Sequence, residues 1–523
     1  MRLSLIATAV IATLGVATAQ PDASIAELHV AVYNDVGAGR SRSDLTRSLR
    51  QMDGVYYREV TAREIRAGAL KDFDLLIHPG GSGGKQARQL AEEGRETVRG
   101  FVRDGGGFIG ICAGAYLASA DYDWSLNILD ARVLDRKHWA RGTGTVDVGL
   151  SAAGKSFFGG DDDRLKIFYG QGPLLAPANN PDIPDYEVLA SYESEIARNG
   201  APKGVMIGTT AIARGRFGKG VVFCFSPHPE KTKALDSLLH QAIAAARAKR
   251  PPSTAEPLPA WSIDQISLTP DISQKGMPHG DYCAPCAAAN LLNQFHARKL
   301  IELPSEFTGA TDESRTRVQR ALAELLGDEA HMNTLRKKGT DRFRIANGLD
   351  RFLRAQDIHS LAVNYLGVRN YDRELLDDPL RPRTKANVGV PQLRHLQREL
   401  AANKGVAILS GSYKPNPDKG GRLERVGGHY VAAVGYGANI AGEHDPSGVI
   451  LHDSNDNHQG VKFVYGKTIK ERTELWERGK LLKAGRDLVQ LINAPIIQDG
   501  RIAFLETVFS FEIKAQSAEK KSP

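Results

Sequence analysis

The feature that most constrains the fold of this chain is the stretch DGGGFIGICAGAYLASA at residues 104–120. A short apolar run ends at Cys112 and a segment of small residues follows, which predicts a strand, a sharp turn and a helix. Gly110, Cys112 and Gly114 have the spacing of the G-x-S-x-G nucleophile elbow, with sulfur in place of the serine oxygen. A core cysteine in a glycine-rich turn is the alternative, and the spacing favours a nucleophile.

Short apolar strands alternate with amphipathic helices between residues 27 and 250. We expect strands at 28–33, 55–60, 75–78, 108–111, 145–148, 166–169, 187–190 and 221–225, and helices at 43–52, 85–103, 113–118 and 232–247. This alternation predicts an α/β fold with a doubly wound, mostly parallel sheet. Sites in such sheets lie at the carboxyl ends of the strands. The loop after His78, the bend at Cys112 and the end of the strand at Phe225 should therefore meet.

The segment after Phe225 reads F-S-P-H-P-E, which places His228 and Glu230 just beyond a strand. A cysteine nucleophile needs a base beside the sulfur and a carboxylate that orients the imidazole, and these two residues supply both. A surface histidine near a helix start is the alternative. Together with the bend at Cys112, the H-x-E motif favours a catalytic site.

The motifs GICAGAYLA and SPHPE on a doubly wound sheet resemble the class I glutamine amidotransferase superfamily. Within it, the chain is most similar to the domain named after the N-terminal part of some biotin–protein ligases, over roughly residues 27–250. The resemblance implies Cys112 as nucleophile, His228 as base and Glu230 as the orienting acid. It also implies an oxyanion hole made of the backbone N–H groups of Ala113, Gly80 and Gly81.

The glycine loop PGGSGGK at residues 79–85 does not fit a nucleotide-binding P-loop. Pro79 stands where the first glycine is required, and Gln86 stands where the hydroxyl residue is required. We interpret the loop as a source of backbone donors for an oxyanion. No ligase segment follows, so biotinylation is not implied, and we predict no cofactor.

A second body is predicted after the Pro-rich linker RPPSTAEPLP, with the linker at 251–259 and the domain at 260–513. It opens with a polar loop, followed by Cys283-Ala-Pro-Cys286 and an Ala-rich helix pattern at 287–295. Two chemistries compete for these cysteines. One is a C-x-x-C redox pair, and the other is a papain-like nucleophile at a helix N-terminus.

Residues downstream favour the nucleophile. His429 lies at the start of an alternating strand expected at 430–436, and Asp453 lies at the end of another strand. A thioredoxin-like protein needs a strand directly before the C-x-x-C, whereas residues 274–281 are polar and glycine-rich. The arrangement resembles the papain-like peptidases of the bacteriocin-processing (double-glycine) type. That resemblance implies an α+β domain with Cys283 as nucleophile, His429 as base and Asp453 as the orienting residue.

The second body departs from that family in two places. Met277 occupies the position of the usual oxyanion glutamine, so Gln274 could serve only if the loop bulges. Cys286 stands where a small or hydroxyl residue is common, and a Cys283–Cys286 disulfide outside the cell would silence the site. Helices are further expected at 314–326, 341–354 and 392–402, a strand at 406–409 and a closing hairpin at 496–504.

The N-terminus has the pattern of a secretory signal peptide over residues 1–19. Arg2 is followed by the apolar stretch 3–16 and by the A-x-A site Ala17-Thr18-Ala19. This stretch is too short to span a bilayer, and no later stretch is long enough. We therefore expect an exported protein, periplasmic or secreted, with a disordered tail at 516–523.

Composition limits the class of partner. The chain has 523 residues, 41% hydrophobic and 25% charged, which is typical of soluble globular domains, and a net charge of +7. It has no dense Lys/Arg stripe, so nucleic-acid binding is not predicted. The run HDSNDNH at 452–458 fails the EF-hand pattern at its glycine and glutamate positions, and we predict no metal.

These observations predict an exported two-domain cysteine hydrolase that acts on amide or peptide bonds. Its substrates would be peptides or amides, and its expected location suggests that they are envelope peptides. The first alternative is a non-catalytic binding protein that keeps both folds. The second is thiol–disulfide exchange at Cys283 and Cys286. The sequence leaves the oligomeric state open.

Overall fold

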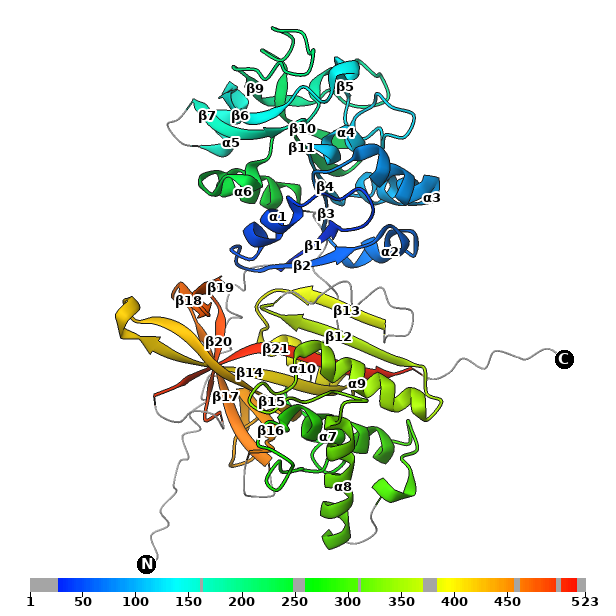
Figure 1. Cartoon of the computed structure of the whole chain (residues 1–523), viewed down its shortest axis with the longest axis vertical. Helices are drawn as coiled ribbons and strands as arrows, with labels where there is room; N and C mark the ends of the chain where they lie inside the picture. Colours follow the sequence, from blue (N-terminus) through cyan, green and yellow to red (C-terminus); the bar gives the residue numbers. More distant parts are fainter. Residues whose placement is uncertain are drawn as a thin grey trace, which may run out of the picture.

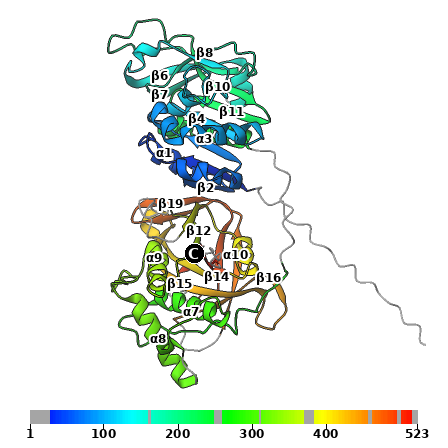
Figure 2. The same ribbon diagram turned by 90° about the vertical axis from the view of Figure 1, so that its right-hand side faces the viewer.

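The computed structural model describes residues 27–159, 163–247, 259–308, 312–369, 383–455, 461–494 and 500–514. The predicted signal peptide, linker residues 251–258 and the tail at 516–523 lie outside the described residues. Figures 1 and 2 show two bodies stacked along the long axis, the first formed by residues 27–247 and the second by residues 259–514.

The first body is built around five parallel strands in the order β2-β1-β3-β4-β11. Their bounds are β1 Leu28–Tyr33, β2 Val55–Val60, β3 Leu75–His78, β4 Gly107–Ile111 and β11 Gly220–Phe225. Both faces of this sheet are buried, one by α1 (Arg42–Leu49) and α6 (Asp236–Ala246), the other by α2 (Ala62–Arg66), α3 (Gly83–Arg103) and α4 (Ala113–Ala118). The predicted α/β fold with a parallel sheet is confirmed for this body, and the strand order is of the flavodoxin type.

Beyond β11 the sheet continues with antiparallel strands. The strands expected at 145–148, 166–169 and 187–190 are present there, whereas those at 131–134, 174–177 and 210–217 and the antiparallel pairing were not predicted. The added elements are β5 Ala131–Leu134, β6 Thr143–Leu150, α5 Ala152–Phe158, β7 Arg164–Gly170, β8 Leu174–Pro177, β9 Glu187–Tyr192 and β10 Thr210–Phe217. The reversal begins at Gly218 and Lys219, because a two-residue connection between β10 and β11 can join only antiparallel neighbours. Strand β10 contains two arginines and a glycine, so the sequence shows no apolar run at this place.

The second body is mainly antiparallel. Its strands are β12 Leu361–Gly367, β13 Arg383–Val388, β14 Gly405–Asn416, β15 Arg422–Ala438, β16 His444–His452, β17 Val461–Ile469, β18 Thr473–Glu477, β19 Lys480–Gly485, β20 Leu488–Ile492 and β21 Ile502–Ile513. Strands β21, β14, β15, β16, β17 and β20 pair in that order, and β20 pairs back to β21, which closes the sheet into a ring. Helices α7 (Cys283–Ala297), α8 (Asp312–Gly327) and α9 (Arg342–Ala355) share one core with this sheet, and α10 (Leu393–Ala401) packs into another.

Strand β15 differs from the expectation. It begins at Arg422, so His429 lies in the middle of the strand and not at its start. The preceding residues pair with the end of β14 in a hairpin whose charged side chains are only partly buried. A half-exposed polar hairpin carries no apolar alternation, which is why the sequence pattern placed the strand start too late.

The two bodies meet edge to edge. Tyr57 of β2 pairs with Val388 of β13, so the outer parallel strand of the first body continues into the sheet of the second. The side chain of Lys483 is buried, and its Nζ donates to the carbonyl of Arg50. Figure 2 shows β2 and β19 facing each other at this junction.

Candidate active sites

Cys112 lies at the bend between β4 and α4. Its backbone has φ +51° and ψ −97°, a left-handed conformation that costs free energy for any residue other than glycine. Gly110 and Gly114 make the bend possible, since a Cβ on Gly110 would lie 2.4 Å from the Gly114 carbonyl oxygen and one on Gly114 would lie 2.2 Å from the His78 carbonyl oxygen. The sequence thus folds into a strained elbow that presents a thiol at the helix N-terminus.

His228 follows β11 and faces this thiol. Its ring hydrogen-bonds Cys112, and its Nδ1 lies 2.7 Å from Oε1 of Glu230. Burial would lower the pKa of His228, but the hydrogen bonds with Cys112 and Glu230 outweigh it and raise the pKa to about 10. The thiol also donates to the carbonyl of Gly170, with sulfur and oxygen 3.4 Å apart. Three distant segments therefore bring sulfur, imidazole and carboxylate together.

Two glycines make room for the imidazole. A Cβ on Gly80 would lie 2.6 Å from Cε1 of His228, and a Cβ on Gly170 would lie 2.6 Å from its Nε2. The glycine loop is held from behind by Gln86, whose amide donates to the carbonyls of Pro79 and Gly37. The loop therefore lies against the reacting side chains in a fixed conformation.

The predicted oxyanion hole draws on the N–H of Ala113, next to the thiol in the chain, and on the glycine loop that lies against His228. Ala113 is the first residue of α4, so its N–H has no acceptor within the helix. The Gly80 carbonyl accepts a hydrogen bond from the N–H of Gly39. The N–H of Gly81 belongs to the same trans peptide as that carbonyl, so it points away from Gly39.

Arg141 is a functional candidate that the sequence analysis missed. Its side chain is 1% exposed and forms an ion pair with Asp135, while its Nη1 has no hydrogen-bond partner. The charges of both Arg141 and Cys112 act on the pKa values of Tyr116 and Tyr169, which burial raises, so these rings lie near both groups. Nothing in the sequence marks Arg141 among its basic neighbours, because its burial depends on the fold.

The second site has the same three groups on different elements. Cys283 is the first residue of α7, His429 lies in β15, and Asp453 directly follows β16. Nε2 of His429 lies 2.6 Å from Oδ1 of Asp453, and both side chains are buried. The other ring nitrogen, Nδ1, is left for the hydrogen bond to Cys283.

The electrostatics of this site favour a thiolate. Burial would raise the pKa of Cys283, but the hydrogen bond and charge of His429, with the N–H groups of Tyr430 and Ala284, lower it overall. Burial would lower the pKa of His429, but the bonds to Asp453 and Cys283 raise it to about 9. Both shifts favour the thiolate–imidazolium form of the pair.

Cys286 and Gln274 lie beside the second site. All four cysteines are free thiols, and burial together with the charge of Cys283 raises the pKa of Cys286 well above its usual value. The side-chain amide of Gln274 donates to Asn455, and its backbone N–H donates to Ser454. Gln274 therefore lies next to the segment that follows Asp453, with its amide engaged there.

The segment before the C-x-x-C differs from that of a thioredoxin-like protein. Residues 271–282 contain turns and no strand, which is not the arrangement that such a redox pair requires. In the described part of the chain no three His, Cys, Asp or Glu side chains gather as metal ligands, and residues 456–458 of the HDSNDNH run lie outside it. Among the described residues, no helix has the length and apolar character needed to cross a membrane.

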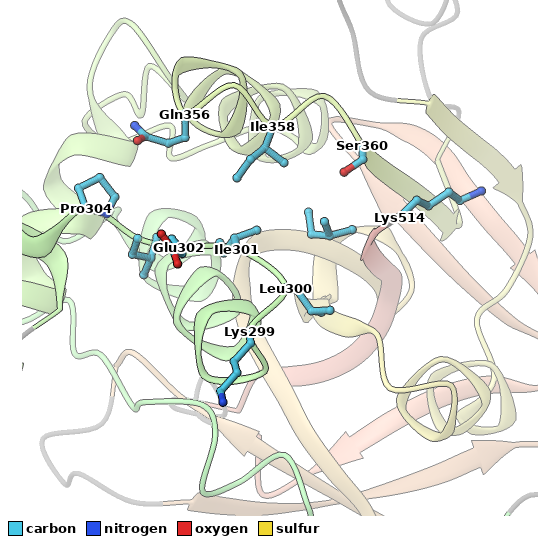
Figure 3. A pocket seen from close by; sticks show the side chains of 11 residues that line it. Lys299, Leu300, Ile301, Glu302, Pro304, Gln356, Ile358, Ser360 and Lys514 are labelled. Atoms are coloured by element: carbon cyan, nitrogen blue, oxygen red, sulfur yellow. The ribbon is translucent and has the colours of Figure 1, made fainter. Parts of the chain in front are cut away.

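A surface hollow of about 790 Å³ lies elsewhere in the second body (Figure 3). Its lining runs from Lys299 to Pro304 and includes Ile358 and Lys514. None of the predicted site residues lines it, so it is separate from both cysteines.

Comparisons with known proteins match the first body. Residues 28–146 match the family model described as "Biotin-protein ligase, N terminal". A pyridoxal 5'-phosphate synthase subunit PdxT from Natronomonas pharaonis is 32% identical over 152 residues, which cover 28% of this chain and 72% of that protein.

Similar solved structures include a GMP synthase component from Thermoplasma acidophilum, which is 16% identical. The match covers 42% of this chain and 94% of that chain, with a TM-score of 0.30. Another is PurLQS from Thermotoga maritima, which is 18% identical. The match covers 42% of this chain and 99% of that chain, with a TM-score of 0.32.

Proposed function

Because the first domain of this chain belongs to the glutamine amidotransferase-like proteins, we propose that it cleaves or transfers an amide group at Cys112. The observation that carries this proposal is the contact of Cys112, on a strained elbow, with an imidazole whose Nδ1 is held by Glu230 at 2.7 Å. We assign Cys112 as nucleophile, His228 as base and Glu230 as the residue that orients the ring.

In the proposed reaction the Cys112 thiolate attacks the amide carbonyl carbon. The oxyanion is stabilised by the N–H groups of Ala113 and of the loop at Gly80 and Gly81. His228 then gives its proton to the leaving nitrogen, the C–N bond breaks, and a thioester remains. Water attacks the thioester carbonyl and His228 takes a proton from it, the C–S bond breaks, and the carboxylic acid leaves with the Cys112 thiolate and protonated His228 restored.

We further assign Arg141 to substrate binding in this site. A buried guanidinium with one free N–H edge beside Tyr116 and Tyr169 is suited to a carboxylate. On this assignment the substrate is a small amide that carries a negative charge. Arg141→Met should then raise KM more than it lowers kcat.

A second activity, peptide-bond hydrolysis, is proposed for the second domain. It rests on the contacts among Cys283, His429 and Asp453, which support the papain-like assignment that the sequence suggested. With a signal peptide predicted at residues 1–19, we propose that both sites work outside the cytoplasm, on peptide or amide substrates of the envelope.

The test is to assay the purified mature chain for ammonia release from small amides and for cleavage of a peptide and cell-wall panel. Cys112→Ala should abolish the first activity and leave the second, and Cys283→Ala should do the reverse. Activity unaffected by either change, or no activity with any substrate, would favour the non-catalytic binding protein. A measurable two-electron potential for Cys283 and Cys286 would favour thiol–disulfide exchange.

A further inference from the structure

A cavity of about 280 Å³ lies between the two domains, beside the strand junction of β2 and β13. Its walls come from both bodies: His29, Tyr56, Arg58, Asp72 and Phe73 from the first, and residues that include Asn387 and Arg398 from the second. We propose that this cavity binds a small oxyanion, a phosphate or a short-chain carboxylate, and that the bound ion contacts both domains.

Arg58 is the central observation. Its side chain is 7% exposed, and its Nε has no hydrogen-bond partner. The guanidinium stacks on the ring of Phe73, 4.8 Å from the ring centroid, and approaches Asp72 only to 3.8 Å. Stacking occupies the face of the guanidinium and leaves its N–H edge for a ligand, and a buried N–H without an acceptor is costly. An oxyanion in the cavity would supply the acceptor.

The charges around the cavity leave a positive surplus. Of its two acidic side chains, Asp72 is paired with Lys385 at 3.1 Å, and Glu399 is paired with Lys404 at 2.8 Å. Arg398, by contrast, forms no ion pair with any residue that the structure describes. Asp72 thus faces two cations, Lys385 at 3.1 Å and Arg58 at 3.8 Å, and Glu64 also acts on the charge of Arg58, so Arg398 is the lining cation that no described acid pairs with.

The remaining polar lining suits the same ligand. The side-chain amide of Asn387 lines the cavity and can donate to oxygen, whereas that of Asn364 already donates to Ser510 at 3.3 Å and to Glu399 at 3.5 Å. The volume suits an ion of a few heavy atoms and is below that of a typical drug-sized site. Since the two arginines come from different domains, a bound ion would join them and resist their separation.

The test is isothermal titration calorimetry of the full mature chain at constant ionic strength, with sodium phosphate in one arm and sodium succinate in the other. Saturable binding of either ion is expected, and the arm that binds identifies the source of the oxygens. Arg58→Met should weaken binding about tenfold, because one charge-assisted hydrogen bond is lost. Arg132→Met removes an exposed arginine of β5 as a matched control and should leave binding unchanged.

Arg58 is buried, so Arg58→Met could also disturb folding. Arg398 is exposed, so Arg398→Met is a second variant without that risk, and it should weaken binding to a similar extent. Lack of saturable binding to the unmodified chain in both arms would overturn the proposal. Equal weakening by Arg132→Met and Arg398→Met would also overturn it, because it would indicate a general charge effect.

Discussion

The two candidate sites use opposite nitrogens of their histidines. Nδ1 of His228 is held by Glu230, whereas Nε2 of His429 is held by Asp453. The acid fixes which nitrogen faces the sulfur, so the ring orientation is set by the position of the carboxylate, two residues away in one site and on a neighbouring strand in the other. Similar chemistry has thus been assembled from two different backbone arrangements.

At the second site this geometry predicts the pH dependence of thiol reactivity. Because the pKa of Cys283 is lowered and that of His429 is raised to about 9, the thiolate–imidazolium pair should exist from below the usual thiol pKa up to about pH 9. Iodoacetamide should therefore alkylate Cys283 at neutral pH. His429→Ala removes the cation and leaves the burial, so the midpoint of alkylation should move to higher pH. Mass spectrometry of the labelled peptide measures this, and an unchanged midpoint would contradict the ion pair.

The neighbouring thiol predicts a redox sensitivity. Cys283 and Cys286 are one helical turn apart in α7, and both are free. With oxidised glutathione, two thiols should be lost per chain as the disulfide forms and two reduced glutathiones are released. The activity that depends on Cys283 should fall in proportion to the thiols lost. Cys286→Ser lacks the second thiol, so its Cys283 should stop at the mixed disulfide with glutathione. Mass spectrometry should therefore find a glutathione adduct on this variant and none on the unmodified chain, and a lasting adduct on the unmodified chain would argue against the disulfide.

At the scale of elements, the elbow depends on close contact of α4 with β3. Gly114→Ala would place a Cβ 2.2 Å from the His78 carbonyl oxygen, so the helix must shift. We expect a loss of about 1–3 kcal/mol in the free energy of unfolding, as for other overpacked positions, and loss of activity at Cys112. Gly100→Ala is the control, because its Cβ would meet only Arg103 at 3.6 Å. Urea unfolding monitored by circular dichroism measures both, and a stable, active Gly114→Ala would contradict the packing.

Elements whose apolar pattern matches their burial could be predicted from the sequence. Strands β1, β2 and β3 were predicted with the bounds that the structure gives, and α4 likewise, because these segments are buried and apolar. The pairing of Cys112 with His228 followed from the rule that parallel strands end at one sheet edge. Strand β10 is largely buried but was missed because two arginines and a glycine interrupt its apolar pattern. The outer half of β15 was missed because its partly exposed, charged residues lack that pattern. The position of Arg141 depends on long-range packing that no local pattern encodes.

At the scale of the whole molecule, Glu27 connects the domains. Its carboxylate lies 2.6 Å from Nε of Arg394 and 3.0 Å from Nε2 of His395, both of the second body. Burial would raise its pKa, but hydrogen bonds with His29, His395 and Arg394 hold it well below the usual range. The stability that Glu27 contributes is therefore present above the pKa of an unfolded glutamate, about 4.3, and is lost as pH falls through the lower pKa of the folded state.

Glu27→Gln should remove this charge while keeping the shape of the side chain. We expect about 2 kcal/mol less stability at neutral pH, since charge-assisted bonds to partly buried partners are lost. The loss should fall on the contact between the domains, so calorimetry should show their unfolding transitions moving apart. Glu93→Gln, at an exposed position of α3, is the control, and it should change neither the stability nor the separation of the two unfolding transitions. If the two variants unfold alike, the domains are held together by the strand pairing of β2 with β13 and by Lys483, and the ion pairs of Glu27 add little.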